Sequence, residues 1–366
     1  MHVTQNTLGH GAEATTWTDL DGRLWCVLVV KGRYRVGEDG ELRQESIEDP
    51  AEVFTYADEY WGEPAASSLR LENDFAPFKL QTDVVVIGHA HAPGGRALQA
   101  CEVALVVGGQ RKILRVHGPR VWTPGLAGVV PSAAQPFVRA PLRWEGAYGG
   151  SAEGHCEWRN PVGRGLARGR SDLAVVGEPA PTQEYIDEPV TRWGARVRPA
   201  SLGPIARGWQ PRLGHAGTYD AAWKADRFPF LPLDFDPLHF QMAPEDQRFP
   251  ALASGTEIAC VNLDPTGMLR FRVPPPPPPA RFRFRDRVDA RALTLDTVVI
   301  EPDERRVSLC WRARVDPGPK LTALRGIELG EEFGPDGLPR KRGKPYFRSL
   351  AEYVRWAKAR RRGGGS

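Results

Sequence analysis

Short apolar runs separated by turn residues recur along this chain and predict β-strands joined as hairpins. Leu24–Val30 reads LWCVLVV and follows Asp21-Gly22, a dipeptide typical of tight hairpin turns. Asp83–Gly88 is a further candidate for a buried strand. Three more pairs of runs flank turn sequences: Glu102–Val107 with Lys112–Val116, Glu257–Leu263 with Met268–Val273, and Thr297–Ile300 with Arg306–Arg314. At least four hairpins joined by long loops favour a mainly β fold, an elaborated antiparallel β-sandwich or distorted barrel.

The middle of the chain, about residues 123–250, contains few periodic runs, and we expect a loop-rich insertion there. Within it, segment 199–247 combines many aromatic and proline residues with no helical or strand period. A solvated linker would lack such aromatic residues, because a polar coil gains nothing from them. The composition therefore predicts ordered irregular structure that is packed by its own rings and stiffened by proline. Long ordered loops of this kind are often functional.

Two segments that follow carry unusual composition. Residues 274–279 are six consecutive prolines, which favour a stiff polyproline II rod of roughly 19 Å. We interpret the rod as a rigid connector between hairpins, although such a run can also serve as a ligand for an aromatic groove. Residues 281–287 read RFRFRDR, and this alternation fits an exposed strand with one basic face.

The C-terminal end has a different pattern. Residues 346–362 carry one apolar stripe at helical spacing, so we expect a helix there and divide the chain into a β-rich domain at 1–320 and an extension at 321–366. Of the formal net charge of +4, residues 339–362 contribute +9, which leaves −5 for the rest. A mildly acidic body is not typical of a nucleic-acid-binding domain. The basic extension could contact nucleic acid or an anionic membrane, dock on the body, or clamp an acidic partner.

The cysteines and the N-terminus indicate a reducing compartment. The five cysteines lie far apart without a CxxC spacing, the chain starts without the pattern of a signal peptide, and the longest apolar run, Leu24–Val30, is too short for a membrane helix. We therefore expect a cytoplasmic protein. The last four residues, GGGS, read as a flexible tail.

Candidate catalytic and metal-binding groups are present without a diagnostic arrangement. His89 and His91 lie two residues apart, yet no third metal ligand has a suitable spacing, and a plain turn explains them better. Asp234, Asp236 and His239 leave a hydrolase of cell-envelope polymers open as an alternative, because paired acids can perform such chemistry. A carbohydrate-binding β-sandwich that stacks sugars on Trp and Tyr is a second alternative. We expect no cofactor and no metal.

A series of short motifs, in order, is similar to the bacterial domain-of-unknown-function family 2169. The resemblance covers about residues 15–315 and rests on many blocks, none decisive alone. They include Asp83–Gly88, Gly149-Gly150, Asn160–Gly163, Gly203–Ile205 with Trp209 and Arg212, Ala216–Asp220 with Trp223, Pro229–Pro232 with Asp234–Asp236, Ala243-Pro244 with Asp246-Gln247, and Trp311-Arg312.

The resemblance implies a non-enzymatic adaptor or chaperone of type VI secretion. Such a protein would bind a toxin effector that carries a PAAR-like spike-tip domain and would help to load it onto the VgrG spike protein, with no small-molecule substrate, no nucleic acid and no membrane insertion. Rings and arginines anchor protein interfaces. On that basis we predict these partner-binding residues: Trp209, Arg212, Tyr219, Asp220, Trp223, Asp234, Phe235, Asp236, Phe240, Asp246, Gln247, Trp144, Tyr148 and Arg164.

Overall fold

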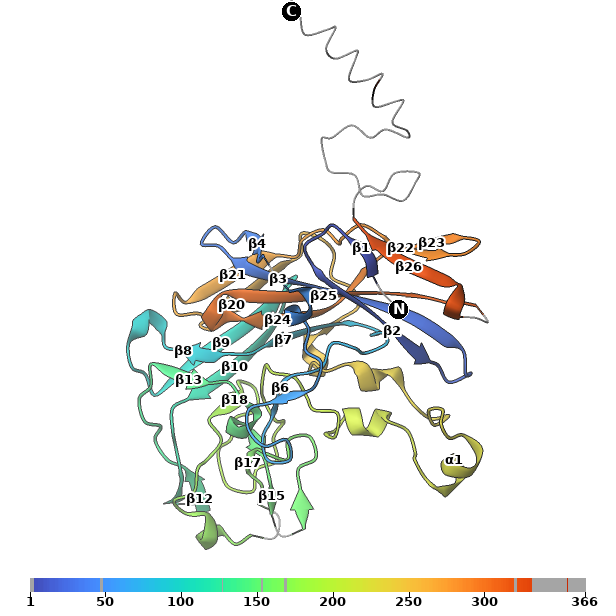
Figure 1. Ribbon diagram of the computed structural model, residues 1–366. Helices are drawn as coiled ribbons and strands as arrows, with labels where there is room; N and C mark the ends of the chain where they lie inside the picture. The colour runs from blue at the N-terminus through green and yellow to red at the C-terminus, as the bar shows by residue number, and fades with distance from the viewer. Residues whose placement is uncertain are drawn as a thin grey trace, which may run out of the picture.

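The largest unit of the fold is a seven-stranded mixed sheet (Figure 1). The computed structural model describes residues 3–330 apart from 47–48, 127, 153, 168–169 and 319–320, together with residue 354. In spatial order the sheet contains β19 (Arg248–Phe249), β7 (Thr82–Val86), β24 (Thr294–Glu301), β25 (Arg306–Val315), β3 (Leu24–Val36) and β2 (Gly11–Thr18), with β4 (Leu42–Gln44) also paired to β3. β7 and β24 are parallel, and the other pairs are antiparallel.

Two smaller sheets lie beside it (Figure 1). The five-stranded sheet is antiparallel and has the order β18 (Gln183–Tyr185), β10 (Gln110–His117), β9 (Ala100–Val107), β20 (Glu257–Val261) and β21 (Met268–Arg272). The four-stranded sheet has the order β1 (Val3–Asn6), β26 (Leu324–Leu329), β22 (Ala280–Phe284) and β23 (Val288–Arg291), with β1 parallel to β26. The proline run 274–279 connects β21 to β22 and therefore joins these two sheets.

Short elements fill the remaining chain. The two-stranded sheets are β5 (Glu59–Tyr60) with β6 (Leu69–Leu71), β8 (His89–His91) with β13 (Arg139–Pro141), β11 (Trp122–Gly125) with β12 (Gly128–Pro131), β14 (Tyr148–Gly149) with β17 (Arg164–Gly165), and β15 (Ser151–Ala152) with β16 (His155–Cys156). The helices are α1 (Ala221–Asp226) and the 3-10 helices η1 (Pro50–Val53), η2 (Pro93–Gly95), η3 (Trp144–Gly146), η4 (Asp172–Val175), η5 (Arg212–His215), η6 (Pro237–Phe240), η7 (Glu245–Gln247), η8 (Pro302–Glu304) and η9 (Leu321–Ala323).

The main core lies between the sheets. Alternate residues of β3, β7, β24 and β25 face the apolar sides of the five- and four-stranded sheets, as in a sandwich. The opposite face of the seven-stranded sheet is also covered, by loop residues such as Phe54 and Met242. β7 is therefore buried along its whole length, which explains the uninterrupted valines Val84–Val86.

The mainly β architecture and the predicted hairpins are confirmed. β9 with β10, β20 with β21 and β24 with β25 pair across the expected turns. The sheets are mixed rather than purely antiparallel, and their strand order closes no barrel within the described residues. β22 is a central strand of its sheet, not an exposed one, because Phe282 and Phe284 point into the core while Arg283 pairs with Glu328.

The expected boundary at 320 lies just before β26, the last described strand of the four-stranded sheet. β26 pairs with β1 and β22, so sheet structure continues to Leu329. The predicted helix at 346–362 lies outside the described residues, apart from residue 354. In the described part of the chain, no helix combines the length and apolar character needed to cross a membrane.

Candidate functional site

Segment 199–247 begins and ends on β7 and projects from the body in between (Figure 1). Near its start, Leu202 accepts a hydrogen bond from the Val86 backbone, and near its end Met242 and Ala243 pack on Val85 and Val299. The chain between these anchors extends away from the sheets around α1. The predicted ordered loop is therefore held at both ends by β7, a fully buried strand.

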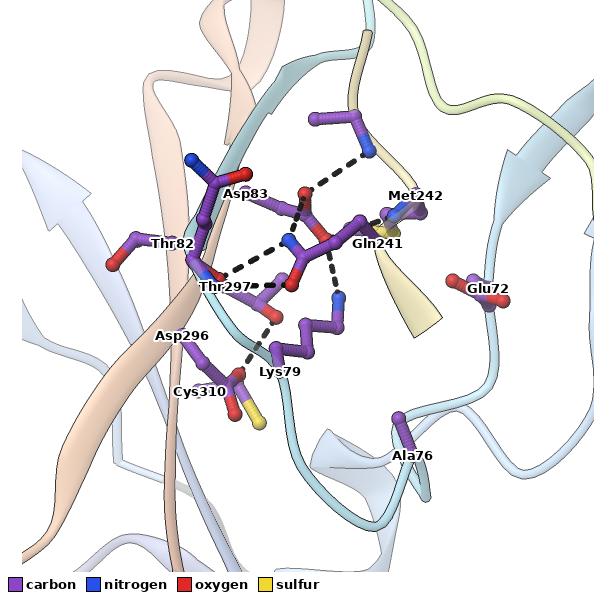
Figure 2. Close-up of polar contacts among 12 residues, drawn as sticks. Glu72, Ala76, Lys79, Thr82, Asp83, Gln241, Met242, Asp296, Thr297 and Cys310 are labelled. Atoms are coloured by element: carbon purple, nitrogen blue, oxygen red, sulfur yellow. Dashed lines mark hydrogen bonds and ion pairs between the residues drawn. The ribbon is translucent and has the colours of Figure 1, made fainter. Parts of the chain in front are cut away.

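The first anchor is the carboxylate of Asp83, which is fully buried in β7 (Figure 2). It accepts hydrogen bonds from Lys79 Nζ at 2.7 Å, Gln241 Nε2 at 2.9 Å, Met242 N at 2.9 Å and Ala243 N at 3.2 Å. Gln241 also accepts a hydrogen bond from the Leu80 backbone at 2.8 Å. A buried carboxylate with this many donors fixes the returning end of the segment to the sheet.

The second anchor is an ion pair between Arg212 and Glu72. Arg212 has no exposed surface, and its Nη2 lies 2.6 Å from Glu72 Oε1. Its other donors bond to backbone carbonyls, Nη1 to Ile205 at 2.6 Å and Nε to His239 at 3.0 Å. Burial disfavours the ionised form of Glu72, but the charges of Arg212, Lys79 and Arg207 outweigh burial, and the pKa of Glu72 is lowered.

A third anchor lies beneath a groove at the end of the segment. Gln247 Nε2 donates to Val84 O at 2.7 Å and Leu202 O at 2.9 Å, and Lys112 Nζ bridges Gln247 and Asp246 at 2.8 Å each. Burial lowers the pKa of Lys112 to about 8, although the negative charge of Asp246 acts to raise it. The groove above has a volume of about 510 Å³, and its lining includes Trp144, Tyr185, Arg198, Ile205, Pro211 and Asp246.

Three of the predicted rings, those of Trp144, Tyr148 and Trp209, pack in the interior. Trp209 meets Trp144 edge to face, with 6.2 Å between ring centroids, and Trp144 Nε1 donates to Pro204 O at 2.9 Å. Tyr148 belongs to a separate apolar cluster with Trp122 and Trp193. These rings therefore stabilise the body beneath the segment.

The segment between the anchors, residues 217–236, forms what we call the α1 loop. Asp220 caps α1 by accepting a hydrogen bond from Trp223 N at 2.8 Å. The Trp223 ring contacts Tyr219 and Phe228 edge to face, at 4.7 and 5.8 Å between centroids, and its Nε1 donates to Phe230 O at 2.8 Å. The loop thus has a small ring cluster of its own.

The α1 loop leaves much of its apolar surface in contact with solvent. Phe228 is 66% exposed and Leu233 is 74% exposed, while Tyr219 and Phe230 are exposed as well. Arg227 Nη2 donates to Leu20 O at 2.7 Å, which ties the loop to the β2–β3 hairpin. Contiguous apolar residues exposed on an anchored loop mark a candidate interaction surface.

The predicted partner-binding residues divide by burial. The exposed members of the set are Tyr219, Asp220, Asp234 and Asp246. The half-buried members are Arg164, Trp223, Asp236 and Phe240. The buried members, which face the interior of this structure, are Trp144, Tyr148, Trp209, Arg212, Phe235 and Gln247.

The partner-binding residues predicted from the sequence do not include three exposed residues of the α1 loop, Phe228, Phe230 and Leu233. They alternate with prolines in Phe228–Leu233, FPFLPL. An apolar run interrupted by prolines cannot form a regular buried strand, because proline lacks the backbone donor that a strand interior needs. That pattern was the available signal for exposed apolar side chains.

The groups of the hydrolase alternative are engaged in local structure. Asp234 accepts hydrogen bonds from Thr218 N at 3.0 Å and Thr218 Oγ1 at 2.7 Å. Asp236 caps η6 and lies 3.1 Å from His215 Nδ1. His239 Nδ1 donates to Arg212 O at 3.0 Å, and burial lowers the pKa of His239. Each group therefore stabilises a turn or an anchor of the segment.

The histidine pair of β8 shares one carboxylate. Asp303 lies 2.8 Å from His89 Nδ1 and 2.7 Å from His91 Nε2, and Arg139 lies 3.3 Å from the same carboxylate. Burial of Asp303 opposes ionisation, but the hydrogen bonds from both imidazoles prevail and lower its pKa to about 2. No group of three or more His, Cys, Asp or Glu side chains suited to a metal ion occurs among the described residues.

Motifs of the resemblance meet around Asn160, which is fully buried. Its side-chain Nδ2 donates to Trp144 O at 2.8 Å and to Tyr148 O at 2.9 Å, and its backbone carbonyl accepts a hydrogen bond from Gly150 N at 2.8 Å. At Gly149, φ is +149°, and a Cβ there would collide with Asn160. These motif residues are thus explained by tight packing of the backbone.

The chain was compared with known protein families, curated proteins and solved structures. No curated protein and no solved structure matches the chain. A family model described as "Uncharacterized protein conserved in bacteria (DUF2169)" matches residues 21–312, which include the β7 strand, the anchors and the α1 loop. The chain belongs to the DUF2169 family.

Proposed function

We propose that this protein is a cytoplasmic, non-enzymatic adaptor of type VI secretion. It binds a toxin effector with a PAAR-like spike-tip domain and helps to load it onto the VgrG spike protein. The resemblance described above and membership of the DUF2169 family are consistent with this role. The observation that carries the proposal is the α1 loop, because it exposes large apolar side chains while both of its ends are fixed by buried bonds.

An anchored apolar loop suits protein binding for energetic reasons. Aromatic side chains supply large contact area, and apolar surface removed from water contributes roughly 25 cal/mol per Å². A loop that is already ordered loses little further conformational freedom when it binds. The anchors at Asp83 and Arg212 therefore support affinity although they lie beneath the surface.

The two alternatives find less support in the geometry of the loop. Sugar stacking uses flat, exposed rings, whereas the planes of Tyr219 and Trp223 meet at 70° and the rings contact each other. The acids of the hydrolase alternative are bonded within the segment, as described above. We therefore propose protein binding ahead of both alternatives.

Co-purification of the effector encoded beside the gene tests the proposal. The double variant Phe228→Ser/Leu233→Ser should lose the effector while its thermal unfolding stays close to that of the parent, because both side chains are largely exposed. Met268→Ser is the matched control, since Met268 is also an exposed apolar residue but lies on β21. Unchanged recovery of the effector with the double variant, or failure of the parent to bind it at all, would refute the proposal.

A further inference from the structure

A second groove lies beside the base of segment 199–247, between the loop at 77–80 and strands β23, β24 and β25. Its volume is about 430 Å³, and its lining includes Phe78, Leu80, Arg291, Ala292, Ala313 and Arg314. Leu80 is about half exposed, so the groove offers apolar surface to solvent. None of the residues predicted from the sequence to bind a partner lines this groove.

Arg314 is held in place by aromatic rings. Its guanidinium carbon lies 4.7 Å from the ring centroid of Trp25 and 4.6 Å from that of Phe78. The side chain is exposed, and among the described residues its guanidinium makes no hydrogen bond or ion pair. Stacking fixes the plane of the guanidinium and leaves its N–H edges available for a planar acceptor.

The groove carries an excess of positive charge. Lys79 and Arg312 reach it as well, but Asp83 neutralises Lys79 at 2.7 Å and Asp296 neutralises Arg312 at 2.5 Å. Arg291 lies 3.9 Å from Asp289, at the limit of an ion pair. That carboxylate also pairs with Arg287 at 3.3 Å. Arg314 and Arg291 therefore present charge that this part of the structure does not balance.

We propose that this groove binds an acidic segment of a partner protein. An Asp or Glu carboxylate would accept two parallel hydrogen bonds from Arg314, and a neighbouring apolar side chain would pack on Phe78 and Leu80. A nucleic acid needs a track of cations for successive phosphates, whereas this groove offers two arginines on apolar walls. The inference rests on the proposed function in one respect: it assigns the acidic segment to the effector that the protein is proposed to bind.

Binding of a short synthetic peptide to the full-length protein tests the inference directly. The probe is fluorescein-labelled Gly-Leu-Asp-Glu-Leu-Gly with blocked ends, and its neutral counterpart carries Asn and Gln in place of the acids. We expect the acidic peptide to bind, to weaken with added salt, and to lose about tenfold in affinity in Arg314→Gln, as expected when a charged hydrogen-bonded pair is removed. Arg314→Lys should recover only part of the affinity, because lysine lacks the planar fork.

The matched control is Arg115→Gln, which removes an exposed arginine that already pairs with Glu102 at 3.0 Å. Equal binding of the acidic and neutral peptides, or an unchanged affinity in Arg314→Gln, would overturn the inference. Tighter binding of inorganic phosphate or of a single-stranded oligonucleotide than of the peptide would overturn it too. If Arg314→Gln retains the effector while the α1-loop variant loses it, the inference fails and the proposed function stands.

Discussion

Asp83 shows how one buried side chain can hold distant parts of this chain together. Its carboxylate gathers an ammonium, an amide and two backbone donors from residues on either side of β7 and from the end of segment 199–247 (Figure 2). A buried charge is tolerated when it is paired and hydrogen-bonded, and removal of one partner leaves the other uncompensated.

Asp83→Ala is therefore expected to lower the free energy of unfolding by about 3–5 kcal/mol, because the buried ammonium of Lys79 would lose its counter-charge. Urea unfolding followed by fluorescence measures this change. Asp187→Ala is the control, since Asp187 is exposed and its pair with Arg198 should contribute less than about 1 kcal/mol. Equal effects of the two substitutions would contradict the argument.

The carboxylate of Asp303 gives a prediction about pH. Its folded-state pKa is lowered to about 2 from an ordinary value of 3.8, so its contribution is present above pH 4 and is lost as the pH falls toward 2. In Asp303→Asn this contribution is absent at every pH. The difference in unfolding free energy between the parent and Asp303→Asn should therefore shrink from pH 5 to about pH 2.5, and a constant difference would exclude this role.

Whether a single ring is buried could not be predicted from its neighbours in the sequence. Trp209 and Phe228 both lie in the same proline-rich segment, yet Trp209 packs against Trp144 and Phe228 faces solvent. Trp144 lies far away in the chain, so no local pattern distinguishes the two residues. The segment as a whole could be identified from its composition because that signal is local.

The same contrast holds for whole elements. The turn between β9 and β10 contains Gly108-Gly109, a pair of neighbouring glycines that both adopt positive φ. Such a pair is a local signal in the sequence, and the hairpin was predicted from it. The parallel pairing of β7 with β24 joins Asp83 to Thr297. Long-range parallel pairs carry no turn signal, because their strands are connected by other elements.

Segment 199–247 should loosen as a unit when its second anchor is removed. Arg212→Ala leaves Glu72 buried without its main partner and frees the carbonyls of Ile205 and His239. We expect faster hydrogen exchange across about residues 205–240 than in the parent, measured by mass spectrometry, with little change in β9 and β10. A uniform increase over the whole chain would show that Arg212 does not act on this segment in particular.

On the scale of the whole molecule, the two proposed binding regions are connected through rings. The ring of Phe78 stacks on Arg314, and its centroid lies 5.6 Å from that of Phe240. The centroid of Phe240 in turn lies 5.3 Å from that of Phe235, at the base of the α1 loop. One partner could therefore contact the loop through apolar residues and the groove through a carboxylate.

The four-stranded sheet makes the end of the described chain necessary for the fold. A chain that ends after residue 330 keeps every described strand of this sheet and serves as the reference. A chain that ends after residue 318 lacks β26, which leaves Phe282 and Phe284 without the apolar cover of Ile327 and Leu329. That shorter chain is expected to aggregate, and a soluble product with unchanged unfolding would contradict the role of β26.

The pairing of β1 with β26 also sets an order of events during synthesis. β1 leaves the ribosome first, but its partner strand is made only after nearly all of the remaining described residues. Until then β1 has no edge to join, and the phenylalanines of β22 stay accessible to other chains. Completion of this small sheet is thus a late step, and conditions that slow elongation prolong the period in which the nascent protein is prone to associate with its neighbours.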